Sequence, residues 1–82
     1  MLSPEDRDLM ARAEQFYKEK LKTELEKSHM DEFVVIEPDS GQYFLGQTLS
    51  QAAAVARAAI PGKRGHIMRV GHEAAVHIGV WP

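Results

Sequence analysis

Residues 33–46 read FVVIEPDSGQYFLG, and this stretch decides the fold. Residues 33–36 are β-branched or aromatic, which is typical of a strand. Residues 39–41 (Asp-Ser-Gly) have the composition of a tight turn, and residues 42–45 return as a second strand that ends at Gly46. The stretch therefore predicts a β-hairpin.

The first strand of this hairpin is apolar on both faces. Because side chains alternate along a strand, Phe33 and Val35 point one way, and Val34 and Ile36 point the other. A strand with one face in water would alternate with polar residues. We therefore expect other elements to cover both faces of this strand.

A second helix and a second hairpin follow. Thr48 and Gln51 have the spacing of a capping box that opens a helix, and the Pro-Gly pair at 61–62 ends it. Residues 66–70 and 75–80 read as a third and a fourth strand with a Gly-His-Glu turn between them. The chain order is thus α-β-β-α-β-β.

The second helix is rich in alanine. Its predicted buried stripe comprises Leu49, Ala52, Ala53, Ala56 and Ile60. Small side chains on that stripe allow the helix to approach the sheet closely. Ala54 and Ala58 lie off the stripe and leave a smooth side that suits contact with another helix.

The chain begins with a long predicted helix, residues 1–29, in which Ser3 is the expected cap and Pro4 suits the first helical position. Apolar residues at helical spacing run from Leu9 to Leu25. The helical pattern starts after Ser3 and ends near Ser28, so the helix measures about 36 Å. A compact domain of this size is only about 30 Å across. We therefore expect the helix to overhang, to bend or to meet a second chain. Tyr17, Leu21 and Leu25 are four residues apart, so the apolar face turns by about 40° at each step. We expect the two halves of the helix to face different surroundings.

These elements predict one α+β domain spanning residues 1–82, with a long N-terminal helix (1–29) and a ββαββ core (32–80). The expected sheet has four mainly antiparallel strands built from two hairpins. The second helix covers one face, and the first helix or a second subunit covers the other. Tyr17, Leu21 and Leu25 are the candidate residues for self-association into a homodimer.

Composition limits the classes of function. There is no cysteine, so disulfides, thiolate metal sites and cysteine nucleophiles are excluded. A small secreted domain would usually carry disulfides, and the polar start at residues 3–6 does not resemble a signal peptide. No apolar run approaches the roughly 20 residues of a membrane span. These features predict a cytoplasmic protein without membrane contact.

Charge is unevenly distributed between the two halves of the chain. Residues 1–47 hold six Lys or Arg against eleven Asp or Glu, whereas residues 48–82 hold four cations against one acid. This asymmetry suggests a surface for an anionic partner. Its candidate residues are Lys63, Arg64, Arg69 and His77. The alternative is that the two halves complement each other, with Arg69 an ordinary surface residue paired with Glu73 or Glu37.

Three segments together resemble a group of small uncharacterised bacterial proteins. They are the run from Phe33 to Tyr43, the helix that ends at Pro61, and the closing run from Arg69 to Gly79, with the motif Arg-Val-Gly-His-x-Ala-Ala-x-x-Ile-Gly. The helix containing Phe16 and Tyr17 is similar too. Members of the group are often encoded beside a retropepsin-like aspartic protease gene. The resemblance implies a two-gene unit of the toxin–antitoxin kind and supplies no catalytic residues.

No catalytic or metal-binding pattern stands out. His66, His72 and His77 are the only candidate ligands of their kind in the C-terminal half, but they lie on a strand start, a turn and an outward strand position, so we expect solvated histidines and no metal. Glu37 and Asp39 are also expected to be solvated. Neither a nucleophile elbow nor a glycine-rich phosphate loop is present. We expect neither an enzyme nor a cofactor.

The sequence is best interpreted as a non-enzymatic protein-interaction module that forms a homodimer and has an unidentified protein partner. A small DNA-binding regulator of the antitoxin type is the alternative, with the basic C-terminal surface on phosphates. A ligand-binding sensor domain is a third interpretation that only the α+β layout favours.

Overall fold

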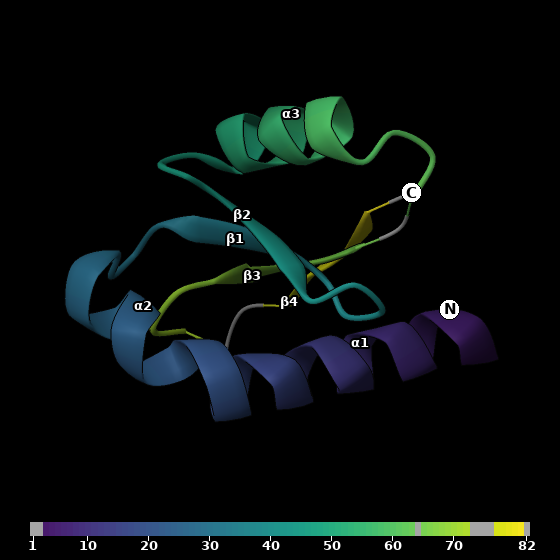
Figure 1. Ribbon diagram of the computed structural model, residues 1–82, viewed down its shortest axis with the longest axis horizontal. Coiled ribbons are helices and arrows are strands. Elements are labelled where there is room, and N and C mark those ends of the chain that lie inside the picture. Colours follow the sequence, from purple (N-terminus) through teal and green to yellow (C-terminus); the bar gives the residue numbers. More distant parts are fainter. Residues whose placement is uncertain (1–2, 64, 73–76, 82) are drawn as a thin grey trace.

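The computed structural model describes residues 3–63, 65–72 and 77–81. Figure 1 shows a sheet between two helical layers. The elements in chain order are α1 (Pro4–Phe16), the π-helix η1 (Tyr17–Leu21), α2 (Lys22–Ser28), β1 (Phe33–Glu37), β2 (Gln42–Gly46), α3 (Leu49–Ala59), β3 (Gly65–Arg69) and β4 (His77–Trp81). The predicted α+β class with a long N-terminal helix is confirmed. Within the described ranges, no helix has both the length and the apolar character needed to cross a membrane.

Helices α1 and α3 begin where their sequences predict. The Ser3 hydroxyl accepts a hydrogen bond from the Asp6 main-chain N–H at 3.1 Å, and Pro4 occupies the first turn, where its missing N–H costs nothing. The Thr48 hydroxyl accepts from the Gln51 N–H at 3.1 Å in the same way. Side-chain caps of this kind satisfy main-chain donors that have no partner inside the helix.

The N-terminal helix bends, and a π-turn lies at the bend (Figure 1). The Lys22 N–H donates to the Tyr17 carbonyl, a five-residue step where an α-helix has four. The extra residue in this turn keeps Tyr17, Leu21 and Leu25 on one face. The expectation that the two halves face different surroundings is therefore wrong, because all three residues belong to one core cluster. The bent helix also fits a molecule whose longest extent is 32 Å.

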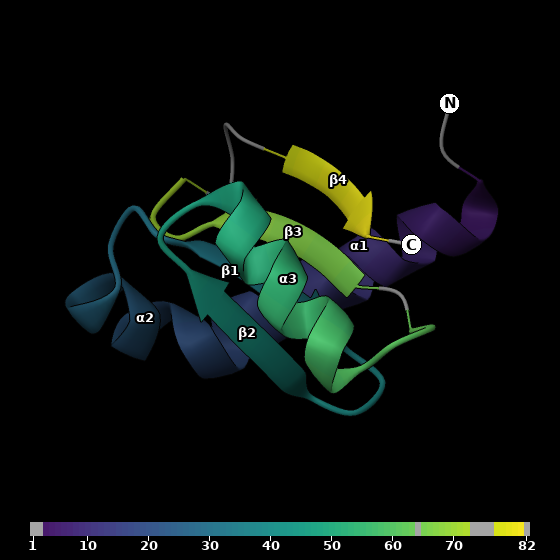
Figure 2. The ribbon, with the colours of Figure 1, turned by 90° about the horizontal axis from the view of Figure 1, so that it is seen from above.

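Strand β1 lies at the centre of an antiparallel sheet. It pairs with β2 through a short turn and with β3 on its other side, so that Val35 lies opposite Phe44 and Ile67. The confirmed part of the predicted sheet is this three-stranded unit. Of β4 the structure describes the main chain, which runs beside β3 in the order β2-β1-β3-β4 (Figure 2).

Both faces of β1 are covered, as its apolar pattern predicts. The cluster under α1, η1 and α2 comprises Ala13, Tyr17, Leu21, Leu25, Val34, Ile36, Met68 and Val70. The cluster under α3 comprises Val35, Ala52, Ala56 and Ile67, with Phe33 and Phe44 packed against it. The two clusters differ in side-chain size, because one helical layer contributes large residues and the other contributes alanines.

Gly46 sets how closely α3 approaches the sheet. A Cβ atom at this position would lie 2.3 Å from the main-chain nitrogen of Ala52 and 2.8 Å from its Cα. These atoms belong to the helix backbone and cannot rotate away. Glycine at the end of β2 is therefore required for the close contact between β2 and α3.

Candidate functional site

The residues of the predicted basic surface do not lie together. Lys63 is exposed in the loop after α3, whereas Arg69 ends β3. Strand β3 runs from Gly65 to Arg69 and spans about 13 Å at about 3.3 Å per residue, and it separates the loop that holds Lys63 from Arg69. Arg64 lies outside the described residues, and of His77 only the main chain is described.

Arg69 holds the start of β1 against the end of β3. Its Nε donates to the Asp31 carbonyl at 3.1 Å, and its guanidinium lies 5.6 Å from the centre of the Phe33 ring. The Asp31 carboxylate lies 2.6 Å from His72 Nε2. This hydrogen bond, aided by the positive charges of His72 and Arg69, lowers the pKa of Asp31. The contacts of Arg69 thus stabilise the fold locally.

Glu37 is buried, so the expectation that it is solvated is wrong. Its carboxylate accepts hydrogen bonds from the main-chain N–H groups of Asp39 and Ser40 at 2.9 and 3.0 Å. These bonds fix the β1–β2 turn. The suggested pairing of Glu37 with Arg69 is also wrong, because Arg69 lies opposite Phe33 at the other end of β1. The other suggested partner, at position 73, lies outside the described residues.

A hollow of about 310 Å³ lies where α1, the β1–β2 turn and the loop after α3 meet. It is lined by Glu5, Leu9, Arg12, Glu37, Asp39, Gly62 and Lys63. Arg12 forms ion pairs with Asp39 and with Asp8, and these two carboxylates raise the pKa of Arg12. Three carboxylates against two cations make the lining acidic on balance. Lys63 is therefore poorly placed to attract a phosphate.

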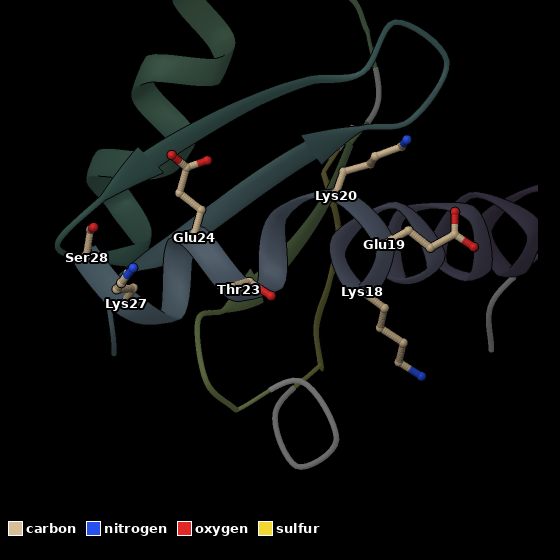
Figure 3. A pocket seen from close by; sticks show the side chains of 7 residues that line it. All are labelled: Lys18, Glu19, Lys20, Thr23, Glu24, Lys27 and Ser28. Atoms are coloured by element: carbon tan, nitrogen blue, oxygen red, sulfur yellow. The ribbon is translucent and has the colours of Figure 1, made fainter.

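A second hollow, of about 400 Å³, lies on the outer side of η1 and α2 (Figure 3). It is lined by Lys18, Glu19, Lys20, Thr23, Glu24, Lys27 and Ser28. All seven side chains are exposed, and Figure 3 shows them pointing in different directions. Catalysis needs groups that converge on one point. This lining offers only mixed surface charge.

The described histidines do not form a metal site. His66 is buried in β3, with its Nε2 3.7 Å from the Glu14 carboxylate, so the expectation of a solvated side chain is wrong. His72 is half-buried beside Asp31. Among the residues that the structure describes, no three His, Asp or Glu side chains are grouped to hold a metal ion.

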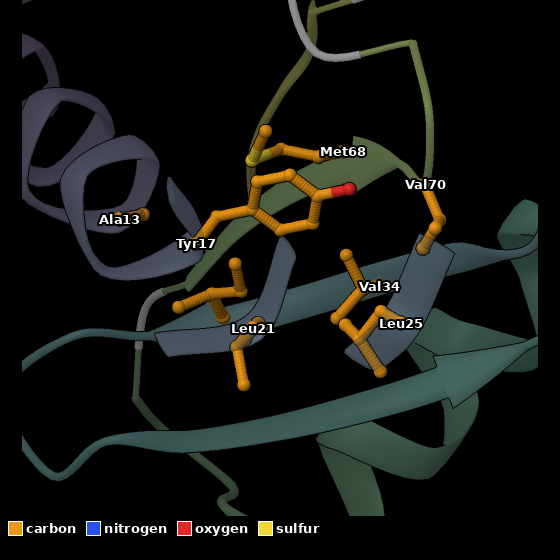
Figure 4. Packing of buried hydrophobic residues seen from close by; sticks show 8 residues of the cluster. Ala13, Tyr17, Leu21, Leu25, Val34, Met68 and Val70 are labelled. Carbon is orange, nitrogen blue, oxygen red and sulfur yellow. The ribbon is translucent and has the colours of Figure 1, made fainter. Parts of the chain in front are cut away.

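The residues predicted to mediate self-association lie in the core of the chain itself. Tyr17, Leu21 and Leu25 are 0%, 6% and 2% exposed. Figure 4 shows them packed with Val34 and Met68. Their assignment to a dimer surface is wrong, because side chains buried within one chain cannot contact a second one.

Tyr17 also ties the helix to the turn after β3. Its hydroxyl donates to Glu26 Oε2 at 2.9 Å and accepts from the Gly71 N–H at 3.3 Å. Lys22 Nζ lies 2.9 Å from the same Glu26 oxygen. The hydrogen bonds from Lys22 and Tyr17 lower the pKa of Glu26. These contacts join the helix to the turn that follows β3.

Exposed large apolar residues among the described ones include Tyr43 on β2 and Leu49 and Val55 on α3, whereas Met30 lies apart from them, between α2 and β1. Tyr43 and Val55 are large apolar residues with 40% and 46% of their surface exposed. Strand β2 pairs with β1 on one side, and no described strand lies on its other side. Its sequence, QYFLG, contains neither a charged residue nor proline, the residues that usually protect a sheet edge. We call β2 together with Tyr43 and Val55 the edge surface.

Sequence reasoning missed the edge surface because an edge is a property of strand order. The uncharged sequence of β2 was visible, but β2 becomes an edge only because β3 pairs with the other side of β1. The side of α3 with Ala54 and Ala58 was correctly expected to be free, and both residues are exposed.

Comparison with known proteins adds no identification. No protein-family model matches the chain, and neither the curated proteins nor the solved structures include a match.

Proposed function

We propose that this protein is a non-enzymatic protein-interaction module that binds its partner through the edge surface. The observation that carries the proposal is the unprotected edge of β2. A strand paired on one side leaves half of its main-chain N–H and C=O groups directed away from the sheet, where an added strand can bind them. Phe44 and Leu45 of β2 are only half-buried, whereas Val35 of β1 is fully buried.

The proposal includes the finer features of the predicted fold. The two-hairpin, four-stranded sheet leaves β2 at one edge. The two-gene unit implied by the resemblance fits a small protein that acts by binding.

The alternative, a DNA-binding regulator, has weaker support. Lys63 lies in an acidic hollow, and Arg69 is engaged with Asp31 and Phe33. Binding to phosphates weakens steeply with salt. A gel-shift titration at two salt concentrations tests this alternative, and tight, salt-sensitive binding would support it.

Site-specific photo-cross-linking tests the proposed function. A photoreactive phenylalanine analogue is placed at position 43, and in a separate protein at position 18, where Lys18 is exposed on the outer side of the helix. The cross-linkers are activated in cells that produce the protein. We expect a covalent adduct from position 43 and none from position 18. Absence of an adduct at position 43, or equal adducts at both positions, would contradict the proposal.

A further inference from the structure

We infer that the edge surface binds a second copy of this chain, with the two β2 strands pairing antiparallel about a two-fold axis at Phe44. The inference rests on the proposed function and names its partner. The pairing joins two sheets into one continuous sheet. Three independent features of the described residues support the second copy as the occupant.

The first feature is a self-complementary register. With Phe44 opposite Phe44 of the other copy, Tyr43 lies opposite the other copy's Leu45, and Gln42 lies opposite the other copy's Gly46. Opposed residues of an antiparallel pair lie on the same face of the sheet. Tyr43 and Leu45 share the face of α1, as their β1 partners Ile36 and Val34 do. The pairing therefore places aromatic and aliphatic side chains in contact on both sides of the axis.

The second feature is the position of α3, which lies above β1 and β2 (Figure 2). Strands in a sheet are about 4.8 Å apart, so two helices centred between β1 and β2 of their own copies lie about 10 Å apart. This value is at the upper end of the usual 8–10 Å between packed helices. The backbone of Gln51 and Ala52 lies against Gly46, so the flank with Gln51 faces β2. Val55, one turn later, lies on that flank and is exposed toward the second helix.

The third feature is charge complementarity on the opposite face. Arg12 and Phe16 extend from the helix to the β1–β2 turn, where Arg12 pairs with Asp39 and the Phe16 ring lies beside Gly41. Lys20 and Glu24 continue this flank at four-residue spacing and are exposed.

The two-fold axis reverses the direction of the second helix. It therefore brings Lys20 of one copy toward Glu24 of the other on each side of the axis. Opposite charges in this arrangement favour the self-complementary pairing.

Sedimentation equilibrium tests the oligomeric state. We expect a species of twice 9.2 kDa for the wild-type chain. Tyr43→Lys introduces a charge at the edge and is expected to raise the dimer dissociation constant by about tenfold or more. Met30→Lys is the matched control, since Met30 is exposed but lies outside the edge surface, and its dissociation constant is expected to be unchanged. Thermal unfolding by circular dichroism verifies that both variants are folded.

Disulfide cross-linking tests the register, because the chain has no cysteine. Directly opposed residues have Cα atoms about 4.5–5.5 Å apart, within the range of a disulfide. We expect Phe44→Cys to form a covalent dimer on oxidation. The matched control is Gln42→Cys, whose two copies would lie about 14 Å apart along the strands and should not cross-link.

Three results would each overturn the inference. The first is a wild-type monomer at millimolar concentration, and the second is a dimer whose dissociation constant Tyr43→Lys does not change. The third is a Gln42→Cys variant that cross-links better than Phe44→Cys. If the chain is monomeric but position 43 cross-links to a different protein, the inference fails and the proposed function stands. If no adduct forms at position 43, the proposed function fails as well.

Discussion

The two helical layers cover the sheet in different ways. The N-terminal layer inserts large side chains, and Tyr17, Leu21 and Leu25 are buried. Helix α3 inserts Ala52 and Ala56, so it lies close to the sheet but has less apolar surface to bury. The comparison teaches that helix length is a poor guide to an interaction surface. The apolar face of the long helix is buried within one chain. Among the described helical residues, the large exposed apolar side chains, Leu49 and Val55, lie on the short alanine-rich helix.

The largest expected effect is on the N-terminal layer. Leu25→Ala removes a side chain that is 2% exposed and leaves a cavity, so we expect the free energy of unfolding to fall by about 3 kcal/mol. Val55→Ala on α3 should lower it by less than about 1 kcal/mol, because that side chain is largely exposed. Urea unfolding of dilute, monomeric protein measures the free energy of unfolding of both variants. Equal decreases for Leu25→Ala and Val55→Ala would contradict the difference in burial between the two helical layers.

The close approach of α3 gives the next effect. Gly46→Ala places a Cβ against the helix backbone, and we expect a loss of about 2–3 kcal/mol. Gly62→Ala is the control: its Cβ meets no atom within 4 Å, and its φ of +81° costs only about 1 kcal/mol. Thermal and urea unfolding compare the stability of the two variants. A smaller decrease in the free energy of unfolding for Gly46→Ala than for Gly62→Ala would show that α3 can move away from the sheet without cost.

A smaller effect concerns the polar contacts of the N-terminal layer. Tyr17→Phe removes the hydroxyl that binds Glu26 and Gly71, and we expect a loss of about 1 kcal/mol. The pKa of Glu26 should rise toward its usual value, because one of the two hydrogen bonds that lower it is gone. Tyr43→Phe, at an exposed position, is the control and should change neither quantity. Urea unfolding and an NMR pH titration provide the measurements, and an unchanged Glu26 pKa would refute the role of the hydroxyl.

The smallest effect is a pH dependence at the end of β3. The hydrogen bond with His72 lowers the pKa of Asp31. The ionised Asp31 carboxylate therefore stabilises the fold at pH values above its ordinary pKa of 3.8, and this stabilisation is lost as the pH falls through the lowered pKa. His72→Ala should raise the Asp31 pKa and remove this loss in acid. An NMR titration of the Asp31 carboxyl carbon measures it. A titration midpoint identical to that of the wild-type chain would contradict the assignment.

Local features of the fold were predictable from the sequence. Ser3 and Thr48 cap their helices as expected, and the apolar pattern of β1 correctly indicated cover on both faces. Each of these depends on residues close together in the chain.

Features that depend on distant partners were not predictable. His66 and Glu37 look solvated in the sequence but are buried, His66 because Glu14 and the helix lie over it, and Glu37 because the turn closes around its carboxylate. The candidate dimer residues were wrong for the same reason. An apolar stripe shows that a surface must be covered, but it does not show whether the same chain covers it.

The π-turn at Tyr17–Leu21 holds one residue more than a turn of regular α-helix. Deleting one residue there would restore regular α-helical bonding and keep Leu25 on the inner face. Inserting one residue elsewhere between Ala13 and Leu25 would instead shift α2 by about 1.5 Å and rotate it by about 100° relative to α1, and Leu25 would leave the core. Single-residue insertions are usually tolerated in loops. Related chains should therefore vary in loop length, and between Ala13 and Leu25 they should either keep the same number of residues or lose one residue together with the π-turn.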